Sequence, residues 1–520
     1  MGASNRREIL NTKKKMSDFS VVPAELRGIL RACKITDRIA YSNGILKGIL
    51  SEYIYGIFSK CAVIEHCYID RDFIEDYASY YSRCFSNYER VCKRVHFFSQ
   101  EYTKKQLEKI LIDQSNDDIQ KLRESYLGFV VLRPLQSTIV GRTCLVPYPQ
   151  GETGRRYPAV CRVDVSFFGI SLFVSCMPFQ EQDFNVAACM TCSLWSALYV
   201  AVYVFGGIRK SPNRITHEAV KHGRSTAREF PNHGVYHEDA VYAIRRANLD
   251  PIVVDVTTAD PLMLANKFLG NVYAYLNLGI SVIVIVDIID QTCGVKKSHA
   301  ITINGYHIEN PDDVNKMPSN SLYACRIDKL YANDDQRVPY SRINVLNNGG
   351  KMRLLSCWED RLSIDKRLEF KPISIIVPVY CKIRVSYEEV WDVTNEFDCM
   401  IQKCKRMNND IKDAVLEWDI TLRDNKNFKQ IVRRNSDVSR DVKLNVLKAS
   451  LPKYIWLICA KINNVTCAYI GIDATDSGQG LRIIDSSVFV TKDLLHFAEV
   501  LVKGNSGSAT NILCDYCLGS

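Results

Sequence analysis

Cys189 and Cys192 lie three residues apart in the stretch AACMTCSLWSALYV, where small residues are followed by an apolar segment. The apolar residues recur with helical spacing, so we expect a helix that starts near Cys189 and stops at Gly206 and Gly207. A cysteine at the start of a helix feels the positive end of the helix dipole, which stabilises its thiolate. Four interpretations follow: a nucleophile, a redox pair, half of a metal site, or a buried helix with two inert thiols.

The redox and metal interpretations lack supporting residues. A structural zinc site usually needs four ligands, and the other CxxC pair, Cys514 and Cys517, is remote in the sequence. A thioredoxin-like pair should follow a strand in a βαβ unit, and the surrounding order of elements does not match that arrangement. Taken alone, the stretch therefore favours a buried helix whose thiols behave as small hydrophobes.

Three polar residues elsewhere could supply the base, the orienting group and the oxyanion donor that a cysteine nucleophile needs. His299 stands at the head of a predicted strand in KKSHAITINGY, from which an imidazole can project toward a helix packed on the sheet. Asp334 ends a later strand in LYANDD, where its carboxylate can accept a hydrogen bond from the imidazole and fix its tautomer. Gln182 precedes the helix in PFQEQDF, where its amide can face the thiol.

The chain order Gln182, Cys189, His299, Asp334, with HAITINGY and the Asn-Asp strand end, resembles papain-like cysteine peptidases, and most of all their C39-like branch. The phrases GFVVLRPL, GRTCLVP and IVPVYCKIRV are similar to a poorly characterised group of bacterial proteins with such a core. The resemblance covers about residues 120–390. By position it implies that Cys189 is the nucleophile and His299 the general base, with Asp334 as orienter and Gln182 as oxyanion-hole donor.

The sequence departs from that family in several places. Cys-Met-Thr stands where C39-type sequences often have Cys-Gly-Pro, and the glutamine lies one residue further from the nucleophile than is common. Asp335 adjoins Asp334, so either carboxylate is a candidate orienter. Cys192 lies one turn into the helix, where most of the dipole effect is lost, so Cys189 is the expected nucleophile.

The surrounding sequence predicts an α+β fold whose papain-like core packs the nucleophile helix on an antiparallel sheet. Residues 1–20 are predicted to be a flexible basic N-terminus. Residues 21–120, with apolar residues at three- and four-residue spacing, are predicted to be a helical region. Residues 121–390 form the predicted papain-like (C39-like) core, and residues 391–520 a C-terminal α+β region.

Composition narrows the class of protein. The chain has 520 residues, a net charge of +9 and 20 scattered cysteines, which together favour a reduced protein over a disulfide framework. We see no secretory signal and no convincing membrane span, so we expect a cytoplasmic location, with a non-classical route of secretion left open. The basic residues are too scattered to predict a nucleic-acid site.

Two further polar clusters are weaker candidates for a functional site. His217, Glu218 and His222 form HExxxH, whose histidines do not share a helix face as those of HExxH do, so we interpret them as a solvated helix. Glu238 and Asp239 suit a helix start, with a place in a substrate cleft as the alternative. We therefore expect no metal and no cofactor.

The predicted activity is that of a cysteine-dependent hydrolase, a peptidase acting on a peptide or protein substrate. The same residues could serve a deamidase or an acyltransferase, since the acyl-enzyme chemistry is shared. A catalytically inactive, peptidase-like binding or scaffold protein is the alternative from another class. The sequence does not indicate the oligomeric state.

Overall fold

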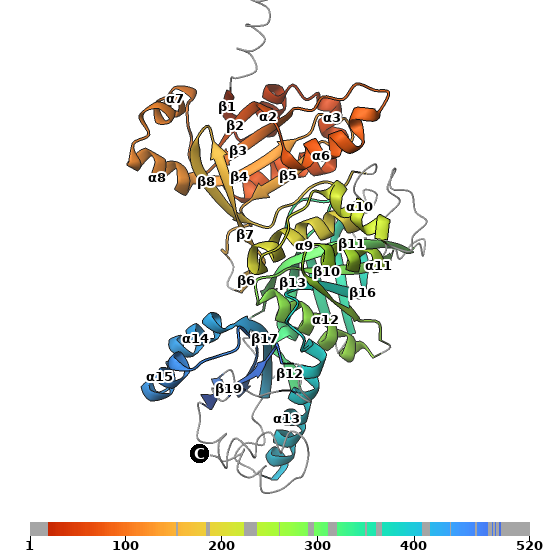
Figure 1. Cartoon of the computed structure of the whole chain (residues 1–520), viewed down its shortest axis with the longest axis vertical. Coiled ribbons are helices and arrows are strands. Elements are labelled where there is room, and N and C mark those ends of the chain that lie inside the picture. The colour runs from red at the N-terminus through yellow and green to blue at the C-terminus, as the bar shows by residue number, and fades with distance from the viewer. Residues whose placement is uncertain are drawn as a thin grey trace, which may run out of the picture.

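The computed structural model is mixed α+β, as predicted (Figure 1). Three parts follow one another along its long axis: an N-terminal sheet with helices, a barrel with helices against it, and a C-terminal sheet with helices (Figure 1). The structure describes residues 19–151, 154–183, 188–222, 237–258, 260–289, 296–309, 320–348, 351–359, 367–407, 416–436, 438–462, 465–476, 481, 484 and 488–489.

The N-terminal part is a five-stranded antiparallel sheet in the order β1-β2-β3-β4-β5. Its strands are β1 (Phe19–Pro23), β2 (Cys61–Tyr68), β3 (Cys92–Phe98), β4 (Tyr126–Leu132) and β5 (Val140–Leu145). Its helices are α2 (Leu26–Cys33), α3 (Asp37–Ser42), α4 (Gly44–Gly48), a π-helical turn (Ile49–Tyr53), α5 (Ile54–Gly56), α6 (Arg71–Ser79), a 3₁₀ turn (Tyr81–Arg83), α7 (Lys104–Asp113) and α8 (Asn116–Ser125).

The prediction that residues 21–120 form a helical region is wrong, because β2 and β3 are central strands of this sheet. Short apolar runs fit a strand or a buried helix equally well by periodicity, and pairing with neighbouring strands decides between them. The predicted boundary at residue 121 is also wrong, since β4 and β5 complete the same sheet. Most of the predicted N-terminal tail, residues 1–18, lies outside the described residues, while Phe19 and Ser20 belong to β1.

A β-hairpin leads from this sheet toward the barrel. It consists of β7 (Cys161–Phe167) and β8 (Ile170–Cys176), whose residues alternate strictly between buried and exposed. Phe168 and Gly169 form the two-residue turn, and both have positive φ values (47° and 93°), as such tight hairpin turns require. The hairpin contacts β4 and β5 with one strand and the helix α9 (Cys189–Phe205) with the other.

The middle part is a barrel of antiparallel strands in the order β10-β11-β13-β14-β15-β16, closed by pairing of β16 with β10. β9 extends the sheet beside β16, and β6 pairs with β11. The strands are β6 (Arg155–Arg156), β9 (Asp250–Asp255), β10 (Val282–Ile289), β11 (Lys296–Ile308), β13 (Ile327–Asn333), β14 (Ser341–Asn348), β15 (Lys351–Glu359) and β16 (Arg367–Val379). The associated helices are α9, α10 (Pro212–His222), α11 (His237–Arg246), α12 (Pro261–Leu276) and a 3₁₀ turn (Tyr323–Arg326).

The predicted helix at the two cysteines is confirmed as α9, which begins at Cys189 and ends before Gly206. Gly206 adopts a positive φ of 78°, a conformation that glycine reaches without steric cost. All residues from Met190 to Ala201 are buried, which suits a helix that is apolar on every side. α9 packs against β11 and β16 of the barrel, so the predicted packing of this helix on an antiparallel sheet is observed.

The C-terminal part is a second five-stranded sheet in the order β12-β17-β18-β19-β20; among its described strands β12 pairs with β17 in parallel and the other pairings are antiparallel. Its elements are β12 (Asn320–Leu322), α13 (Tyr387–Met407), β17 (Leu416–Asp424), α14 (Asn425–Arg434), α15 (Arg440–Lys448), β18 (Tyr454–Ile462), β19 (Val465–Asp473) and β20 (Val488–Phe489). The prediction of α+β structure for residues 391–520 agrees with the described elements, although α13 begins before residue 391 and residues 490–520 lie outside the described part.

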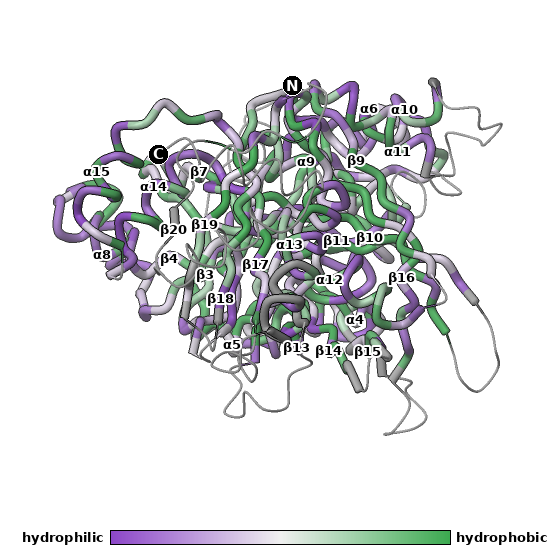
Figure 2. Tube along the Cα trace, turned by 90° about the horizontal axis from the view of Figure 1, so that it is seen from below, coloured by the Kyte–Doolittle hydropathy of each residue, from purple (hydrophilic) through white to green (hydrophobic). Residues whose placement is uncertain are grey.

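The hydrophobic core links the N-terminal part to α9. One continuous cluster contains residues of β2, β3 and β4, both strands of the hairpin and most of α9. A second cluster fills the barrel and reaches the C-terminal sheet. Figure 2 shows the hydrophobic stretches along the barrel strands β10, β11 and β16, while α8 and α15 at the periphery are largely hydrophilic. None of the described helices has both the length and the hydropathy to cross a lipid bilayer.

Candidate active site

The thiol of Cys189 lies at the N-terminal end of α9. Cys189 is the first residue of the helix and is partly exposed, whereas the rest of the first turn is buried. The N-cap residue, Ala188, has no side-chain group that could accept hydrogen bonds from the N–H groups of the first turn. These N–H groups and the helix dipole favour negative charge at this position.

The structure brings Cys189, His299 and Asp334 together, as predicted. His299, on β11, is buried, and its Nε2 lies 2.9 Å from Oδ1 of Asp334. The Cys189 thiol lies close enough to this side chain to help raise the pKa of His299. Because Nε2 is occupied by Asp334, Nδ1 is the ring nitrogen that remains for the thiol.

Charge on the imidazole is favoured by its neighbours. Burial alone would lower the pKa of His299, because it disfavours the charged form. The Asp334 carboxylate, through its charge and its hydrogen bond, outweighs this effect with help from Cys189 and Asp335, and the pKa of His299 is raised well above its ordinary value. An imidazolium held in this way is the partner that a reactive thiolate needs.

Distance distinguishes the two adjacent carboxylates. Oδ1 of Asp335 lies 3.9 Å from Nε2 of His299, compared with 2.9 Å for Asp334. Asp334 also accepts a hydrogen bond from the Gln336 backbone N–H at 3.1 Å, which fixes the carboxylate. Asp334 is therefore the carboxylate that holds the ring of His299, and Asp335, the alternative that the sequence left open, is an additional buried acid.

Asp335 should make stability depend on pH. Burial raises its pKa to about 7, so the folded protein holds this proton more tightly than the unfolded chain, where a carboxyl titrates near pH 4. Stability is then lost as the pH rises from about 4 to 7. Replacing Asp335 with asparagine should remove this loss, so that the variant gains up to about 4 kcal/mol relative to the wild type between pH 4 and pH 8.

Urea unfolding of the wild type and of Asp335→Asn, from pH 4 to pH 8, measures the difference between their unfolding free energies. A difference in unfolding free energy that stays constant from pH 4 to pH 8 would contradict the assignment of this titration to Asp335. Asp328→Asn, which removes a half-buried carboxyl that contacts His307 on the same two strands, is the matched control.

Cys192 is a buried thiol beside the acid. Its Sγ receives a hydrogen bond from Nε2 of Gln180 at 3.8 Å, and the thiol lies close enough to Asp335 for the charge of that carboxylate to act on it. Burial and the nearby charge of Asp335 raise the pKa of Cys192 well above its ordinary value, which keeps it protonated. The preference for Cys189 over Cys192 as nucleophile therefore has a physical basis.

Gln182 lies in the segment that leads to α9, close to the acid pair. Its backbone N–H donates to the backbone oxygen of Asp335 at 3.4 Å, and only 8% of the residue is exposed. Its side-chain amide makes no hydrogen bond to any residue in the described part of the chain, so it remains available for a ligand. Gln180, which the sequence analysis did not single out, is instead engaged with Cys192.

Asn333 links the segment that precedes α9 to the barrel, and the sequence did not single it out as a candidate. Its Nδ2 donates to the backbone oxygens of Met177 and Pro178 at 3.4 and 3.0 Å. Its Oδ1 accepts from Asn304 and from the backbone of Tyr340. The only signal in the sequence was a buried-strand position occupied by asparagine directly before the two aspartates.

Hydrogen bonds also fix α9 on the strand that carries the histidine. Ser193 Oγ donates to the backbone oxygen of Ala300, and Thr302 Oγ1 donates to the backbone oxygen of Ser193, both at 3.0 Å. Ser196 Oγ donates to Pro178 O at 2.8 Å. These polar residues on an apolar helix set the position of α9 along β11.

His299, Asp334 and Asp335 also satisfy the geometry of a metal-binding group, since one donor atom from each lies within 4.8 Å of the others. Two of them are already used in the chain of contacts from Cys189 to Asp334. A cation would have to displace that chain, and Asp335 with a pKa of about 7 is a poor ligand at neutral pH. The donor set therefore fits a thiol–imidazole–carboxylate site better than a metal site.

The remaining sequence candidates lie on α10 and α11. Glu218 of the HExxxH pattern is buried and forms ion pairs with Lys210 and Arg214, so the prediction of a wholly solvated helix face is wrong at this position. It was missed because its cationic partners lie in the preceding loop and one turn earlier on the helix. Glu238 and Asp239 occupy the first turn of α11, as expected for acidic residues at a helix start.

Neither protein-family models nor curated proteins give a match to this chain. The functional assignment therefore depends on the geometry of the site. That geometry is a partly exposed thiol at a helix start, a buried imidazole in contact with it, and a carboxylate that holds the imidazole.

Proposed function

We propose that this protein is a cysteine-dependent hydrolase of amide bonds, and specifically a peptidase with a papain-like catalytic arrangement. The observation that carries the proposal is the chain of contacts from Cys189 through His299 to Asp334 at the first turn of a buried helix. Its cytoplasmic location and its peptide or protein substrate belong to the same proposal.

The chemistry follows from the order of these contacts. His299 holds the proton of the thiol, and the thiolate of Cys189 attacks the amide carbonyl to give a tetrahedral intermediate. The imidazolium then donates its proton to the leaving amine, which departs and leaves an acyl-enzyme on sulfur. Water, deprotonated by the neutral imidazole, releases the acid and regenerates the thiol. Asp334 keeps the ring in place and stabilises its charged form throughout.

Charge on the intermediate needs donors near the thiol. The backbone N–H at the start of α9 and the unengaged amide of Gln182 are the candidates on this side of the site. Gln182→Ala should lower kcat/KM by about 10²–10³-fold, the usual effect of removing one oxyanion donor. Gln180→Ala is the matched control, because its amide contacts Cys192 rather than Cys189, and it should cost less than tenfold. Equal losses in the two variants would contradict the role of Gln182.

Asp334 and Asp335 should differ sharply in their effect on turnover. Asp334→Ala removes the group that holds His299, so kcat/KM should fall by about 10²–10⁴-fold. Asp335→Asn leaves that hydrogen bond intact and should change kcat/KM by less than about tenfold. Initial rates with one peptide substrate measure both, and a larger loss for Asp335→Asn would reverse the assignment of the orienter.

The amide that is attacked and the acceptor of the acyl group together distinguish the three chemistries of this site. A peptidase transfers the acyl group of a backbone amide to water, and a deamidase transfers that of a glutamine side chain to water. An acyltransferase transfers the acyl group to an amine. The site geometry up to the acyl-enzyme is common to all three. An inactive binding protein would have no need for an accessible thiol in contact with an imidazole, which is why we favour an enzyme.

Mass spectrometry of a complex peptide mixture tests the proposal. Full-length protein should cleave backbone bonds in the presence of a metal chelator, and Cys189→Ala should give none of the new termini. Deamidated but uncleaved peptides would assign the deamidase instead. Identical product lists for wild type and Cys189→Ala, or no products from either, would overturn the proposed function.

A further inference from the structure

A cavity of about 650 Å³ lies where the N-terminal sheet meets α9, remote from Cys189. One of its walls includes Tyr199, ten residues beyond Cys189 and therefore about 15 Å further along the helix. Four arginines from four different segments line it: Arg94 on β3, Arg142 on β5, Arg162 on β7 and Arg209 after α9. The lining contains two acidic residues, Glu65 and Asp164.

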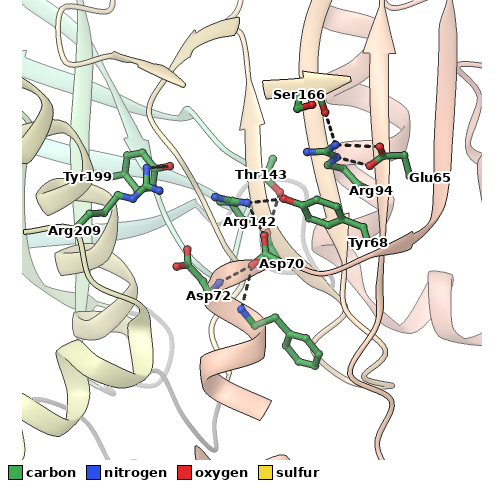
Figure 3. A network of polar contacts seen from close by, with 12 residues as sticks. Glu65, Tyr68, Asp70, Asp72, Arg94, Arg142, Thr143, Ser166, Tyr199 and Arg209 are labelled. Atoms are coloured by element: carbon green, nitrogen blue, oxygen red, sulfur yellow. Dashed lines mark hydrogen bonds and ion pairs between the residues drawn. The ribbon is translucent and has the colours of Figure 1, made fainter. Parts of the chain in front are cut away.

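One of these arginines is fully committed to the protein. Arg94 donates to both carboxylate oxygens of Glu65, at 2.6 and 3.1 Å, and to the backbone oxygen of Ser166 at 2.8 Å (Figure 3). This side chain is 9% exposed. It forms a rigid, neutralised wall of the cavity and has little capacity for a ligand.

Arg142 is held from behind but keeps a free donor. It forms an ion pair with Asp70 at 2.7 Å and donates to the hydroxyl of Tyr68 at 2.9 Å. Nine-tenths of its side chain is buried, and its Nε makes no hydrogen bond to any described residue. A buried donor without an acceptor is costly, and a bound anion would satisfy it.

Arg209 reaches the same space from the opposite wall. It donates to the hydroxyl of Tyr199 at 2.5 Å, and its guanidinium lies 4.4 Å from the centre of that ring. It forms no ion pair with an acidic residue in the described part of the chain. Figure 3 shows the side chains of Arg142 and Arg209 directed toward one another, with Asp72 below them.

Besides Asp70, which pairs with Arg142, the buried acid Asp72 lies close enough for both guanidinium groups to act on its carboxyl. Burial raises its pKa to about 6, although Arg142 and Arg209 both act to lower it. A carboxyl with this pKa is mostly ionised at neutral pH, so Asp70 and Asp72 together offset much of the charge of Arg142 and Arg209. What the two walls offer an anion is therefore hydrogen-bond donors: the unpartnered Nε of Arg142 and the guanidinium of Arg209, which is bonded only to the neutral hydroxyl of Tyr199 among the described residues.

We propose that this cavity binds a small phosphorylated molecule whose phosphate is held between Arg142 and Arg209. A tetrahedral oxyanion can accept hydrogen bonds from two opposite walls at once, and guanidinium groups match its geometry. The cavity has the size of small-molecule sites. The rest of the ligand is a planar ring, because Tyr68, Phe129, Phe168 and Tyr199 line the remaining surface.

Such a ligand would bridge the N-terminal sheet and the helix that carries Cys189. Ligand that binds only the folded protein raises its stability by mass action. This inference does not depend on the proposed hydrolase activity, and a binding measurement tests it without a substrate for the active site.

Calorimetric titration of the full-length protein with adenosine monophosphate and with inorganic phosphate, at constant ionic strength, tests the proposal. Both should bind and raise the unfolding temperature, and adenosine monophosphate should bind at least about tenfold more tightly because its ring adds contacts. Arg209→Ala should weaken binding of the nucleotide at least about tenfold, the loss expected for a charge-assisted hydrogen bond.

Arg245→Ala is the matched control, because Arg245 is an exposed arginine on α11 outside the cavity lining. This variant should bind adenosine monophosphate within about twofold of the wild-type affinity. Arg209→Gln, which keeps the length and polarity of the side chain, replaces the alanine variant should that variant unfold. Absence of binding by both probes, or binding that neither Arg209 variant weakens, would overturn the site. Equal affinity for the two probes would overturn the planar-ring part of the ligand.

Discussion

Replacement of Cys189 with alanine should abolish amide hydrolysis, with a loss in kcat on the order of 10⁶-fold. The thiol is the only group in the proposed mechanism that forms a covalent bond to the substrate. Cys189 is partly exposed at the helix start, so its truncation should leave the fold and the unfolding temperature nearly unchanged. Initial rates with a peptide identified from the mixture, together with thermal unfolding, measure both effects.

Cys192→Ser is the matched control for this loss. It changes the other thiol of the same helix turn, keeps a small polar group near Asp335, and should retain kcat within about tenfold. A Cys192→Ser variant that is inactive beside an active Cys189→Ala would move the nucleophile by one turn of α9.

His299→Ala should be the next most damaging change, with a fall in kcat/KM of about 10³–10⁴-fold. The imidazole both stabilises the thiolate and delivers the proton to the leaving amine, so two steps fail together. The raised pKa of His299 also predicts that activity extends above the ordinary titration range of histidine and is lost at higher pH, when the imidazolium deprotonates.

Rates measured from pH 5 to pH 10 check this second effect. The alkaline limb of kcat/KM should lie well above pH 6.5 in the wild type and move toward lower pH in Asp334→Ala, because that variant lacks the carboxylate that stabilises the charged ring. An alkaline limb that does not move would contradict the coupling of His299 to Asp334.

The sequence predicted α9 well because several signals agree there. The helical spacing of apolar residues, the small residues before Cys189 and the paired glycines after Phe205 all indicate the same element. The N-terminal sheet was missed because β2 and β3 are short apolar runs, for which pairing partners far away in the sequence decide the structure. Closure of the barrel by β10 and β16 was equally out of reach, since nothing local in either strand specifies that pairing.

The candidate site was predictable where residue type carries the chemistry. A cysteine at a helix start, a histidine heading a strand and an aspartate ending another could be named in advance, and the structure places all three in contact. The choice between Asp334 and Asp335 needed a distance, because adjacent residues leave a strand end in different directions. Asn333 and Gln180 act through hydrogen bonds to segments distant in the sequence, which no local pattern reports.

The cavity lined by four arginines could not be predicted from the sequence either. Its four arginines are spread over more than a hundred residues, and each looks like an ordinary surface cation in the sequence. Only the meeting of β3, β5, β7 and the segment after α9 brings them together. The shared core of the N-terminal sheet and α9 is what fixes that meeting.

The most direct test of the central claim is the rate of iodoacetamide alkylation at pH 6, followed cysteine by cysteine by mass spectrometry. Cys189 should react at least about tenfold faster than the exposed Cys67 and Cys381, because His299 stabilises its thiolate at a pH where free thiols are protonated. That advantage should vanish in His299→Ala. A Cys189 that reacts no faster than Cys67 and Cys381, or whose rate does not depend on His299, would contradict the assignment of Cys189 as an activated nucleophile.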